Sequence, residues 1–275
     1  MTLLKGAVFF SILSTIFVVY LIKKHFEEKV EAPEISIGNG QTQGERDEQE
    51  DSFATIKAED DLLAVVADGM GGYGHGKKAS KLAVDTFLEQ FSRQYNIEEV
   101  NKFLINSSYI SNDKVIKMAE GRKIGTTLVS VFIRNDLLYW SSAGDSHIYL
   151  FKGEKLKLLN TPHTYENLLK EAYSAGEISR DKLLNSPKKE RLTSYIGYDD
   201  FHEVDYSECP IPLESGDKIL LCSDGLYKTL SDLELEDTLA KDVSPQEISS
   251  CLIDMVENKN IVSQDNATLI VLKKN

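Results

Sequence analysis

The stretch Leu62-Leu63-Ala64-Val65-Val66-Ala67-Asp68-Gly69-Met70-Gly71-Gly72 decides the fold of this chain. Its first six residues are uninterruptedly apolar, which is typical of a buried strand. Asp68 therefore stands where a strand ends, and the glycines behind it let the backbone bend tightly and approach a ligand closely. Carboxylates and exposed backbone carbonyls are the oxygen ligands that hard divalent cations prefer. The stretch therefore indicates a strand-end position suited to a cation.

The same pattern recurs elsewhere in the chain. Asp224 follows the apolar run Ile219–Cys222, Asp145 follows the strand-like Leu137–Trp140, and Asp265 stands just before another strand-like run. Taken alone, each acid would be read as a turn or helix-cap residue. Together with Asp68 they predict a metal site that is assembled from distant segments.

Length, composition and net charge limit the classes of protein to which this chain can belong. The 275 residues allow one large domain or two small ones, and 41% hydrophobic residues suffice for a sizeable core. The net charge of −13, from 44 acidic and 31 basic side chains, argues against nonspecific nucleic-acid binding. It does not exclude a phosphorylated substrate, because bound cations can reverse the local charge. Cys209, Cys222 and Cys251 lack a C-x-x-C spacing, which fits buried thiols in a reducing compartment.

The N-terminus predicts a membrane anchor. Residues 6–22 carry no charged side chain and are apolar on every face, which favours a single transmembrane helix. Lys5 precedes the run, whereas Lys23, Lys24 and Lys29 follow it, so the positive-inside rule places the rest of the chain in the cytoplasm. A secretory signal is the alternative, but no Ala-x-Ala-like cleavage site follows the run. We expect residues 1–30 to form the anchor and juxtamembrane segment, and 31–275 to form the globular domain.

Hydrophobic periodicity predicts more strands than helices, with many strands paired as hairpins. Asn135-Asp136 is a typical hairpin turn, and Ser244-Pro245-Gln246-Glu247 is a typical helix start. This pattern predicts an α+β fold in which helices are segregated from antiparallel sheets. Strands are expected at residues 35–38, 52–57, 62–67, 126–133, 137–142, 148–151, 155–159, 201–209, 218–222 and 267–272, and helices at 77–95, 97–118, 165–175, 179–184 and from 245.

Six motifs occur in a fixed order and carry a family resemblance. They are Arg46-Asp-Glu-Gln-Glu-Asp51, Ala67-Asp-Gly-Met-Gly-Gly72 with Gly76 and Ala79-Ser80, Gly125-Thr-Thr-Leu128, Gly144-Asp-Ser146, Leu221-Cys-Ser-Asp-Gly-Leu226 and Asp265-Asn-Ala-Thr268. From about Ile35 to its C-terminus the chain resembles the bacterial form of the metal-dependent Ser/Thr protein phosphatases, the type 2C or PPM family. The resemblance does not cover residues 1–30.

The resemblance implies an αββα sandwich of two packed antiparallel sheets flanked by helices. It implies hydrolysis of phosphoserine and phosphothreonine in proteins by a metal-bridged hydroxide at a two-metal site, with phosphoprotein partners in opposition to a Ser/Thr kinase. Mg²⁺ or Mn²⁺ suits this oxygen-rich ligand set, whereas zinc would favour His or Cys. The implied residues are Asp68, Gly69, Asp224 and Asp265 as metal ligands, Glu50 and Asp51 near the metals, Asp145 at a third, weaker metal and Arg46 holding the phosphate.

Several positions depart from the family pattern. Tyr73 and Lys77 stand where His and Glu are common, His147 replaces an Arg, and Met70 stands where many members have a proton-donating His. None of these positions is an implied metal ligand. Two other functions therefore stay open: a catalytically silent module that binds phosphoproteins, and a hydrolase of small phosphoesters. For Arg46 the alternative role is a surface ion pair within its acidic segment.

Overall fold

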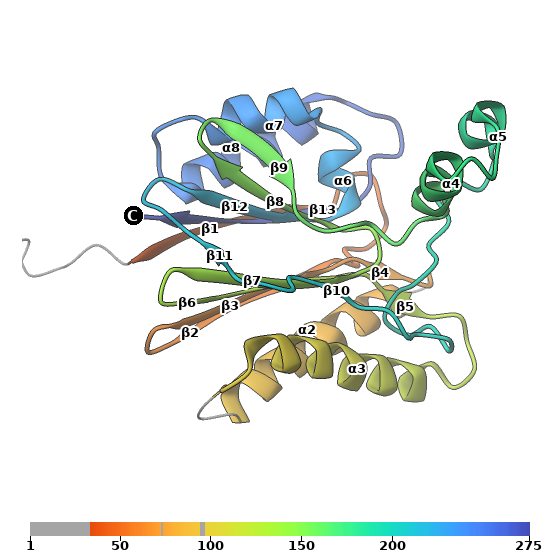
Figure 1. The fold of residues 1–275 in the computed structure, drawn as a ribbon, viewed down its shortest axis with the longest axis horizontal. Helices are drawn as coiled ribbons and strands as arrows, with labels where there is room; N and C mark the ends of the chain where they lie inside the picture. Colours follow the sequence, from red (N-terminus) through yellow and green to blue (C-terminus); the bar gives the residue numbers. More distant parts are fainter. Residues whose placement is uncertain (1–33, 73, 94–96) are drawn as a thin grey trace, which may run out of the picture. The chain divides into compact units, whose positions relative to one another are not determined.

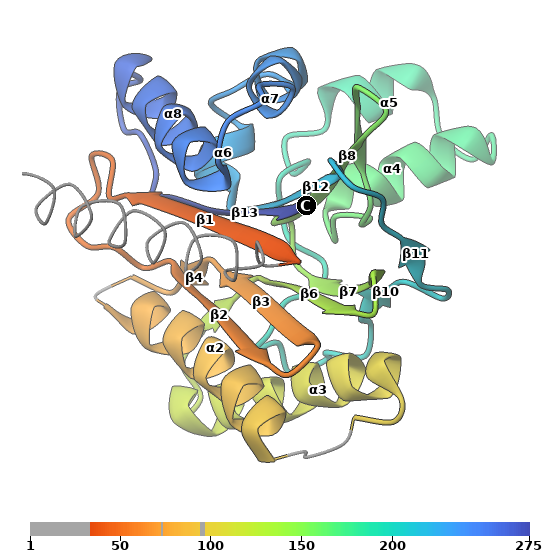
Figure 2. The same cartoon turned by 90° about the vertical axis from the view of Figure 1, so that its left-hand side faces the viewer.

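The computed structural model describes residues 34–275, apart from 73 and 94–96. Within this part, Ile35–Lys274 forms one compact unit. Two antiparallel sheets face each other, and helices cover the outer face of each (Figures 1 and 2). The predicted α+β sandwich is therefore confirmed.

The first sheet has the strand order β1-β13-β12-β8-β9, and every pairing in it is antiparallel. Its outer face carries α8 (Pro245–Asn258), which packs on β1 and β13, together with α7 (Asp232–Leu239) and the short α6 (Asp224–Tyr227). The strands are β1 (Ile35–Thr42), β8 (His147–Lys152), β9 (Lys155–Leu158), β12 (Lys218–Cys222) and β13 (Ala267–Lys274).

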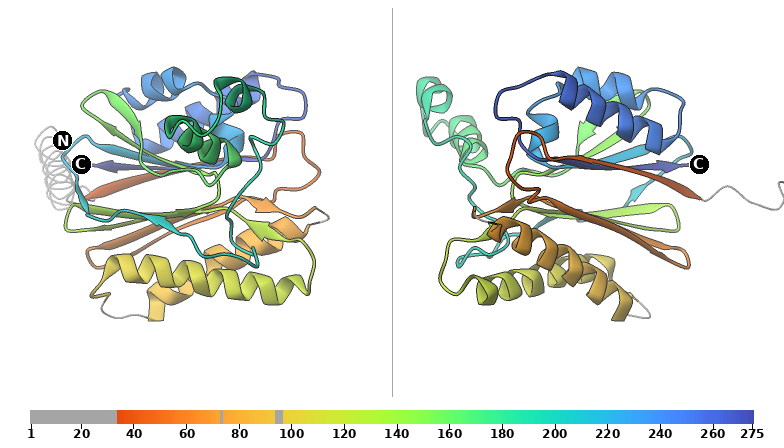
Figure 3. Two further views of the ribbon diagram at one scale, coloured as in Figure 1. Left: turned by 45° about the vertical axis from the view of Figure 1, so that its right-hand side comes forward. Right: turned by 180° about the vertical axis from the view of Figure 1, so that it is seen from behind.

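The second sheet has the order β10-β7-β6-β3-β2, with β11 also paired to β7. Its outer face is covered by α2 (His75–Arg93) and α3 (Val100–Ala119), as both views in Figure 3 show. The strands are β2 (Ser52–Ala58), β3 (Asp61–Ala67), β6 (Leu128–Arg134), β7 (Leu137–Ala143), β10 (Asp205–Tyr206) and β11 (Ile211–Pro212).

The apolar run of β3 is buried on both of its faces. Val66 packs between the two sheets, in a cluster that includes Ile219 and Ile270 of the first sheet. Val65, its neighbour in sequence, packs instead with Phe87 beneath α2 and α3. Successive side chains of a strand point to opposite faces, so a strand in the middle of four layers must be apolar throughout. This explains why β3 reads as an unbroken hydrophobic run.

Two short strands and two helices complete the unit near one end of the sandwich. The strands β4 (Gly69–Met70) and β5 (Gly125–Thr126) pair with each other. The helices α4 (Tyr165–Ser174) and α5 (Arg180–Asn185) pack on each other and stand to the right in Figure 1. The chain after α5 returns to β5, where Ile196 and Thr126 exchange backbone hydrogen bonds of 2.9 Å.

Most of the predicted elements are confirmed, with small shifts at their ends. Asn135 and Asp136 both have positive φ, as the predicted hairpin turn requires, and Ser244 forms a capping box with Glu247. The predicted strand 201–209 is wrong in extent, since only Asp205–Tyr206 pairs with a neighbour. The sequence analysis did not predict α6 or α7, because each is short and α7 presents little apolar periodicity.

The anchor predicted at residues 6–22 lies outside the described residues and stays a prediction. In the part of the chain that the structure describes, no helix combines the length and the apolar character needed to cross a membrane.

Candidate active site

Asp68 is held in place by the Gly-Thr-Thr segment. Its carbonyl oxygen accepts hydrogen bonds from the Thr126 hydroxyl and the Thr127 backbone N–H, both at 2.8 Å, and its own N–H donates to the Thr127 hydroxyl at 3.0 Å. A Cβ on Gly69 would lie 2.3 Å from the carbonyl oxygen of Gly76, so only glycine lets α2 begin this close to the strand end. The motif at 125–127 therefore fixes the backbone on which Asp68 is displayed.

Asp51 connects the two sheets beneath the site. It lies just before β2, is buried, and accepts a 2.8 Å hydrogen bond from the Ser223 hydroxyl at the end of β12. The Ser223 oxygen in turn accepts a 2.9 Å hydrogen bond from the backbone N–H of Thr268 in β13. Asp51 thus ties the second sheet to the ends of two strands of the first.

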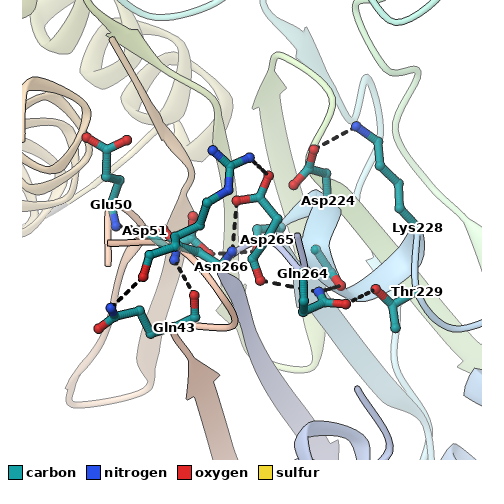
Figure 4. A network of polar contacts seen from close by, with 12 residues as sticks. Gln43, Glu50, Asp51, Asp224, Lys228, Thr229, Gln264, Asp265 and Asn266 are labelled. Atoms are coloured by element: carbon teal, nitrogen blue, oxygen red, sulfur yellow. Dashed lines mark hydrogen bonds and ion pairs between the residues drawn. The ribbon is translucent and has the colours of Figure 1, made fainter. Parts of the chain in front are cut away.

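Asn266 fixes the acidic segment that contains Glu50. Its side-chain oxygen accepts from the Glu50 backbone N–H at 2.8 Å, and its amide donates to the carbonyls of Gln43 and Glu48 at 2.8 and 3.1 Å (Figure 4). The sequence analysis quoted Asn266 within a motif but assigned it no role. Asn266 holds the loop before β2 against the start of β13.

The structure brings the predicted residues to one cleft of about 710 Å³. Seven of the eight predicted site residues line it, and Asp51 lies apart from the lining, buried below. The lining includes Arg46, Glu50, Asp68, Gly69, Asp145, Asp224 and Asp265. Acids from strand ends in both sheets therefore converge, as the recurring pattern in the sequence predicted.

Arg46 is paired within the cleft. Its guanidinium lies 2.5 Å from an Asp265 carboxylate oxygen, and the two side chains are 55% and 37% exposed. Arg46 therefore sits at the solvent side of the cleft, with part of its fork of N–H donors free to meet an anion. The ion pair that the sequence left as an alternative is present, but with Asp265 and not with the neighbouring acids.

Lys228 is a cleft residue that the sequence analysis missed. Its ammonium lies 2.6 Å from an Asp224 carboxylate oxygen (Figure 4) and 3.9 Å from Asp145. The available signal was its spacing, because residues four apart on a helix lie side by side and α6 continues into Lys228. A cation therefore stands beside two of the predicted metal ligands.

Three acids at the site, Asp51, Asp68 and Asp145, resist ionisation. Burial raises the pKa of Asp51 to about 7 and the pKa of Asp145 to about 6, and in both the charge of Asp224 adds to the effect. Burial, followed by the charges of Asp51 and Asp224, raises the pKa of Asp68 well above its usual range. Burial lowers the pKa of Lys228, but the attraction of Asp224 outweighs it and the net shift is upward. Such a concentration of like charge is a favourable environment for a divalent cation.

Two further observations fit bound cations. Asp224 Oδ1 and Glu50 Oε1 are buried oxygens without a hydrogen-bond partner, which is costly unless something positive meets them. Across the described residues no three acidic, His or Cys side chains stand close enough to hold a metal by themselves. Backbone oxygens such as that of Gly69, together with water, would have to complete the shell, which is how Mg²⁺ is usually held.

The model of the family described as "Protein phosphatase 2C" matches residues 41–258. The chain belongs to this family. Among curated members it is 29% identical to the serine/threonine phosphatase stp of Listeria welshimeri, over 84% of this chain and 92% of that one. It is 30% identical to the protein phosphatase PhpP of Streptococcus pneumoniae, over 78% of this chain and 86% of that one.

Solved structures show that this phosphatase 2C chain shares its fold with others. The Streptococcus agalactiae serine/threonine phosphatase matches with a TM-score of 0.77 and 24% identity, over 88% of this chain and all of that one. The catalytic domain of the phosphatase PstP, solved in complex with two manganese ions, matches with a TM-score of 0.69 and 22% identity, over 87% of this chain and 97% of that one. Because both identities are low, these matches establish the fold alone.

Of the described departures from the family pattern, Met70 lines the cleft, whereas Lys77 and His147 do not. Lys77 is exposed on α2 and does not line the cleft. His147 stacks on Tyr227 with ring centroids 3.6 Å apart, and burial lowers its pKa to about 4, so it is a neutral packing residue. His163 is not one of these departures; it accepts a 3.2 Å hydrogen bond from the Gly144 backbone N–H and so supports the turn before Asp145. Tyr73 lies outside the described residues.

Proposed function

We propose that this protein removes phosphate from phosphoserine and phosphothreonine in other proteins, with Mg²⁺ or Mn²⁺ bound in the acidic cleft. The observation that carries the proposal is the convergence of Asp68, Asp224 and Asp265, from both sheets, beside the exposed guanidinium of Arg46. Membership of the phosphatase 2C family supports it. The substrates would be proteins phosphorylated by a Ser/Thr kinase.

The residues of the cleft fit two cations, with a third at Asp145. Asp68, the Gly69 carbonyl, Asp224 and Asp265 would hold the two, and Glu50 and Asp51 would act through water. When bound, such cations neutralise a phosphate ester's charge and lower the pKa of water, so that hydroxide becomes available at neutral pH. The ligand set is all oxygen, which suits Mg²⁺ and Mn²⁺ equally and does not choose between them.

In this proposal Arg46 binds the substrate phosphate, and the cysteines do not act as nucleophiles. Arg46 would exchange its contact with Asp265 for two oxygens of the substrate phosphate, because its planar fork matches a phosphate group. No protein nucleophile is required. Cys222 is fully buried, and burial raises the pKa of its thiol, so it is unsuited to attack phosphate.

The proposal is tested by phosphate release from a Thr-phosphorylated peptide, using the full chain in mild detergent with Mn²⁺ or with EDTA. Asp224→Asn should reduce release to the EDTA background while leaving the circular dichroism spectrum unchanged. Asp113→Asn is the matched control, since Asp113 is exposed on α3 and away from the cleft. Turnover of a small phosphoester with none of the peptide would contradict a protein phosphatase. A folded, metal-binding protein with neither activity would favour the phosphoprotein-binding module.

We also propose that residues 6–22 anchor the protein as a single span with the phosphatase domain in the cytoplasm. The uncharged run and the lysines that follow it support this. The anchor would raise the effective concentration of the domain near membrane-bound substrates. Membrane fractionation of the full chain beside a variant without residues 6–22 tests it: recovery of both in the soluble fraction would refute the anchor.

A further inference from the structure

A second cavity adjoins the acidic cleft, and its charge has the opposite sign. It has a volume of about 800 Å³ and shares Met70 and Leu192 with the cleft. Four cationic side chains line it, and among its described lining residues Asp199 is the one acid. We call this cavity the basic groove; its cations are Arg122, Lys123, Lys188 and Arg191.

The positive charge of the basic groove contrasts with the charge of the whole chain. The protein as a whole carries a net charge of −13. Lys123, Lys188 and Arg191 are exposed, and within the described residues none of them makes an ion pair with a carboxylate. Arg122 has a long contact of 3.5 Å to the exposed Glu120, and its guanidinium lies 3.4 Å from the Nε2 atom of His75. Unpaired cations that gather in one cavity leave a field suited to an anionic ligand.

The groove is built on a well-anchored segment. Besides the Ile196–Thr126 pair, the Gly197 N–H donates to the Asn112 side chain at 2.7 Å, and the Tyr165 N–H donates to the Arg191 carbonyl at 2.9 Å. The backbone that carries Lys188 and Arg191 is therefore fixed to β5, to α3 and to the start of α4. Such anchoring lowers the entropy lost when a ligand is bound.

Aromatic side chains also line the basic groove. Tyr195 and Tyr198 both line it, with ring centroids 5.2 Å apart. Tyrosine offers rigid contact area together with a hydroxyl, which suits the backbone and the side chains of an extended peptide.

We infer that the basic groove binds an acidic segment of the protein substrate, next to the phosphorylated residue that enters the cleft. The inference rests on the proposed phosphatase function for its biological meaning. A substrate with Asp or Glu beside its phosphoserine or phosphothreonine would place the phosphate in the cleft and the carboxylates against the groove cations. The inferred surface therefore selects substrates by flanking charge.

The test compares two phosphothreonine peptides that differ only in their flanks, one rich in Asp and Glu and the other in Ser and Gln. At low salt the acidic peptide should have a kcat/KM about tenfold higher, because each exposed ion pair contributes only a few-fold and several act together. The advantage should shrink as NaCl is added, since salt screens exposed charges.

The variant Lys123→Gln/Lys188→Gln/Arg191→Gln should lose the preference while keeping its rate on a small phosphoester, because none of the three residues lines the acidic cleft. The matched control is Lys57→Gln/Lys155→Gln/Lys157→Gln, which removes the same charge from exposed strand positions outside both cavities and should keep the preference. Equal rates on both peptides in the unaltered protein, or a preference that survives in the groove variant, would overturn the inference.

Equilibrium binding in EDTA separates this inference from the proposed function. Fluorescence anisotropy with the same labelled peptides needs no turnover. Tighter binding of the acidic peptide that is lost in the groove variant supports the groove even if no phosphate is ever released. Phosphate release without any discrimination in binding or in rate supports the phosphatase and refutes the groove. Equally tight binding of a single-stranded oligonucleotide through the same residues would overturn the assignment to acidic peptides.

Discussion

Lys228 distinguishes this cleft from a simple cluster of acids. Its ammonium contacts Asp224 and faces Asp145, so it neutralises part of the charge that would otherwise attract a cation. Its side chain is 43% exposed, so it can swing away when another cation arrives. We therefore expect Lys228 to weaken metal binding at this site.

Replacing Lys228 with Met should tighten Mn²⁺ binding by about tenfold, because the repulsion between two neighbouring cations is removed. Isothermal titration calorimetry on the metal-free protein measures this directly. Lys228→Arg keeps the positive charge and should stay close to the unaltered affinity. A Met variant that binds Mn²⁺ no better, or more weakly, would show that Lys228 does not compete with the metal.

Asp51 and Asp145 give metal-free protein a distinct pH dependence. Their folded-state pKa values, about 7 and about 6, lie above the ordinary value of 3.8. A carboxyl with a raised pKa binds its proton more tightly in the folded state, so its contribution to stability is complete below the unfolded pKa and is lost as the pH rises through the folded pKa.

In EDTA, the free energy of unfolding should therefore fall between about pH 4 and pH 7, by on the order of a few kcal/mol, and level off above that range. Urea denaturation at several pH values measures it. Asp51→Asn should flatten the decline, because this side chain cannot ionise. A free energy of unfolding that rises over this range would contradict the assignment.

Gly38 sets how closely α8 lies on the first sheet. It belongs to β1, and a Cβ there would lie 2.2 Å from the backbone carbonyl of Pro245. That contact is with backbone atoms, which cannot turn aside as a flexible side chain could. The close packing of α8 on β1 therefore depends on the absence of a side chain at Gly38.

Gly38→Ala should lower the free energy of unfolding by about 1 to 3 kcal/mol, because the helix must shift to relieve the overlap. Thermal and urea denaturation test this. Gly153→Ala is a useful control, since Gly153 also needs glycine for its φ of 58° but has open space around it. It should lose only about 0.5 to 1 kcal/mol. Equal losses at the two positions would mean that helix packing is not the cause.

At the scale of the whole unit, both sheets contribute acids to the cleft. Asp68 follows β3 of the second sheet, whereas Asp224 and Asp265 adjoin β12 and β13 of the first. Cations bound among these acids, with backbone oxygens and water completing their shells, would join the sheets and would bind the folded state alone.

Mn²⁺ at about a hundred times its dissociation constant should then stabilise the fold by about 2.7 kcal/mol. The shift in melting temperature should vanish in Asp68→Asn and in Asp224→Asn, which remove ligands from opposite sheets. Asp113→Asn should keep the full shift. Stabilisation that persists after loss of either cleft acid would place the metal elsewhere.

The sequence by itself determined most of the elements and predicted the type of site. Unbroken apolar runs located the central strands, because a strand between layers must bury both of its faces, and the recurrence of Asp at strand ends predicted the oxygen ligands. The helix start at Ser244 followed from local hydrogen bonding, which neighbouring residues settle among themselves. The short strand Asp205–Tyr206 was overestimated, because its apolar neighbours pack without pairing.

Only the tertiary structure decided which side chains share the cleft. Asp51 lies below it, Arg46 meets Asp265 from more than two hundred residues away, and the groove cations come from segments on either side of α4 and α5. Periodicity records which face of an element is apolar. Periodicity does not record the register and the packing of elements far apart in the chain. Register and packing bring the charged side chains of the cleft and the groove together.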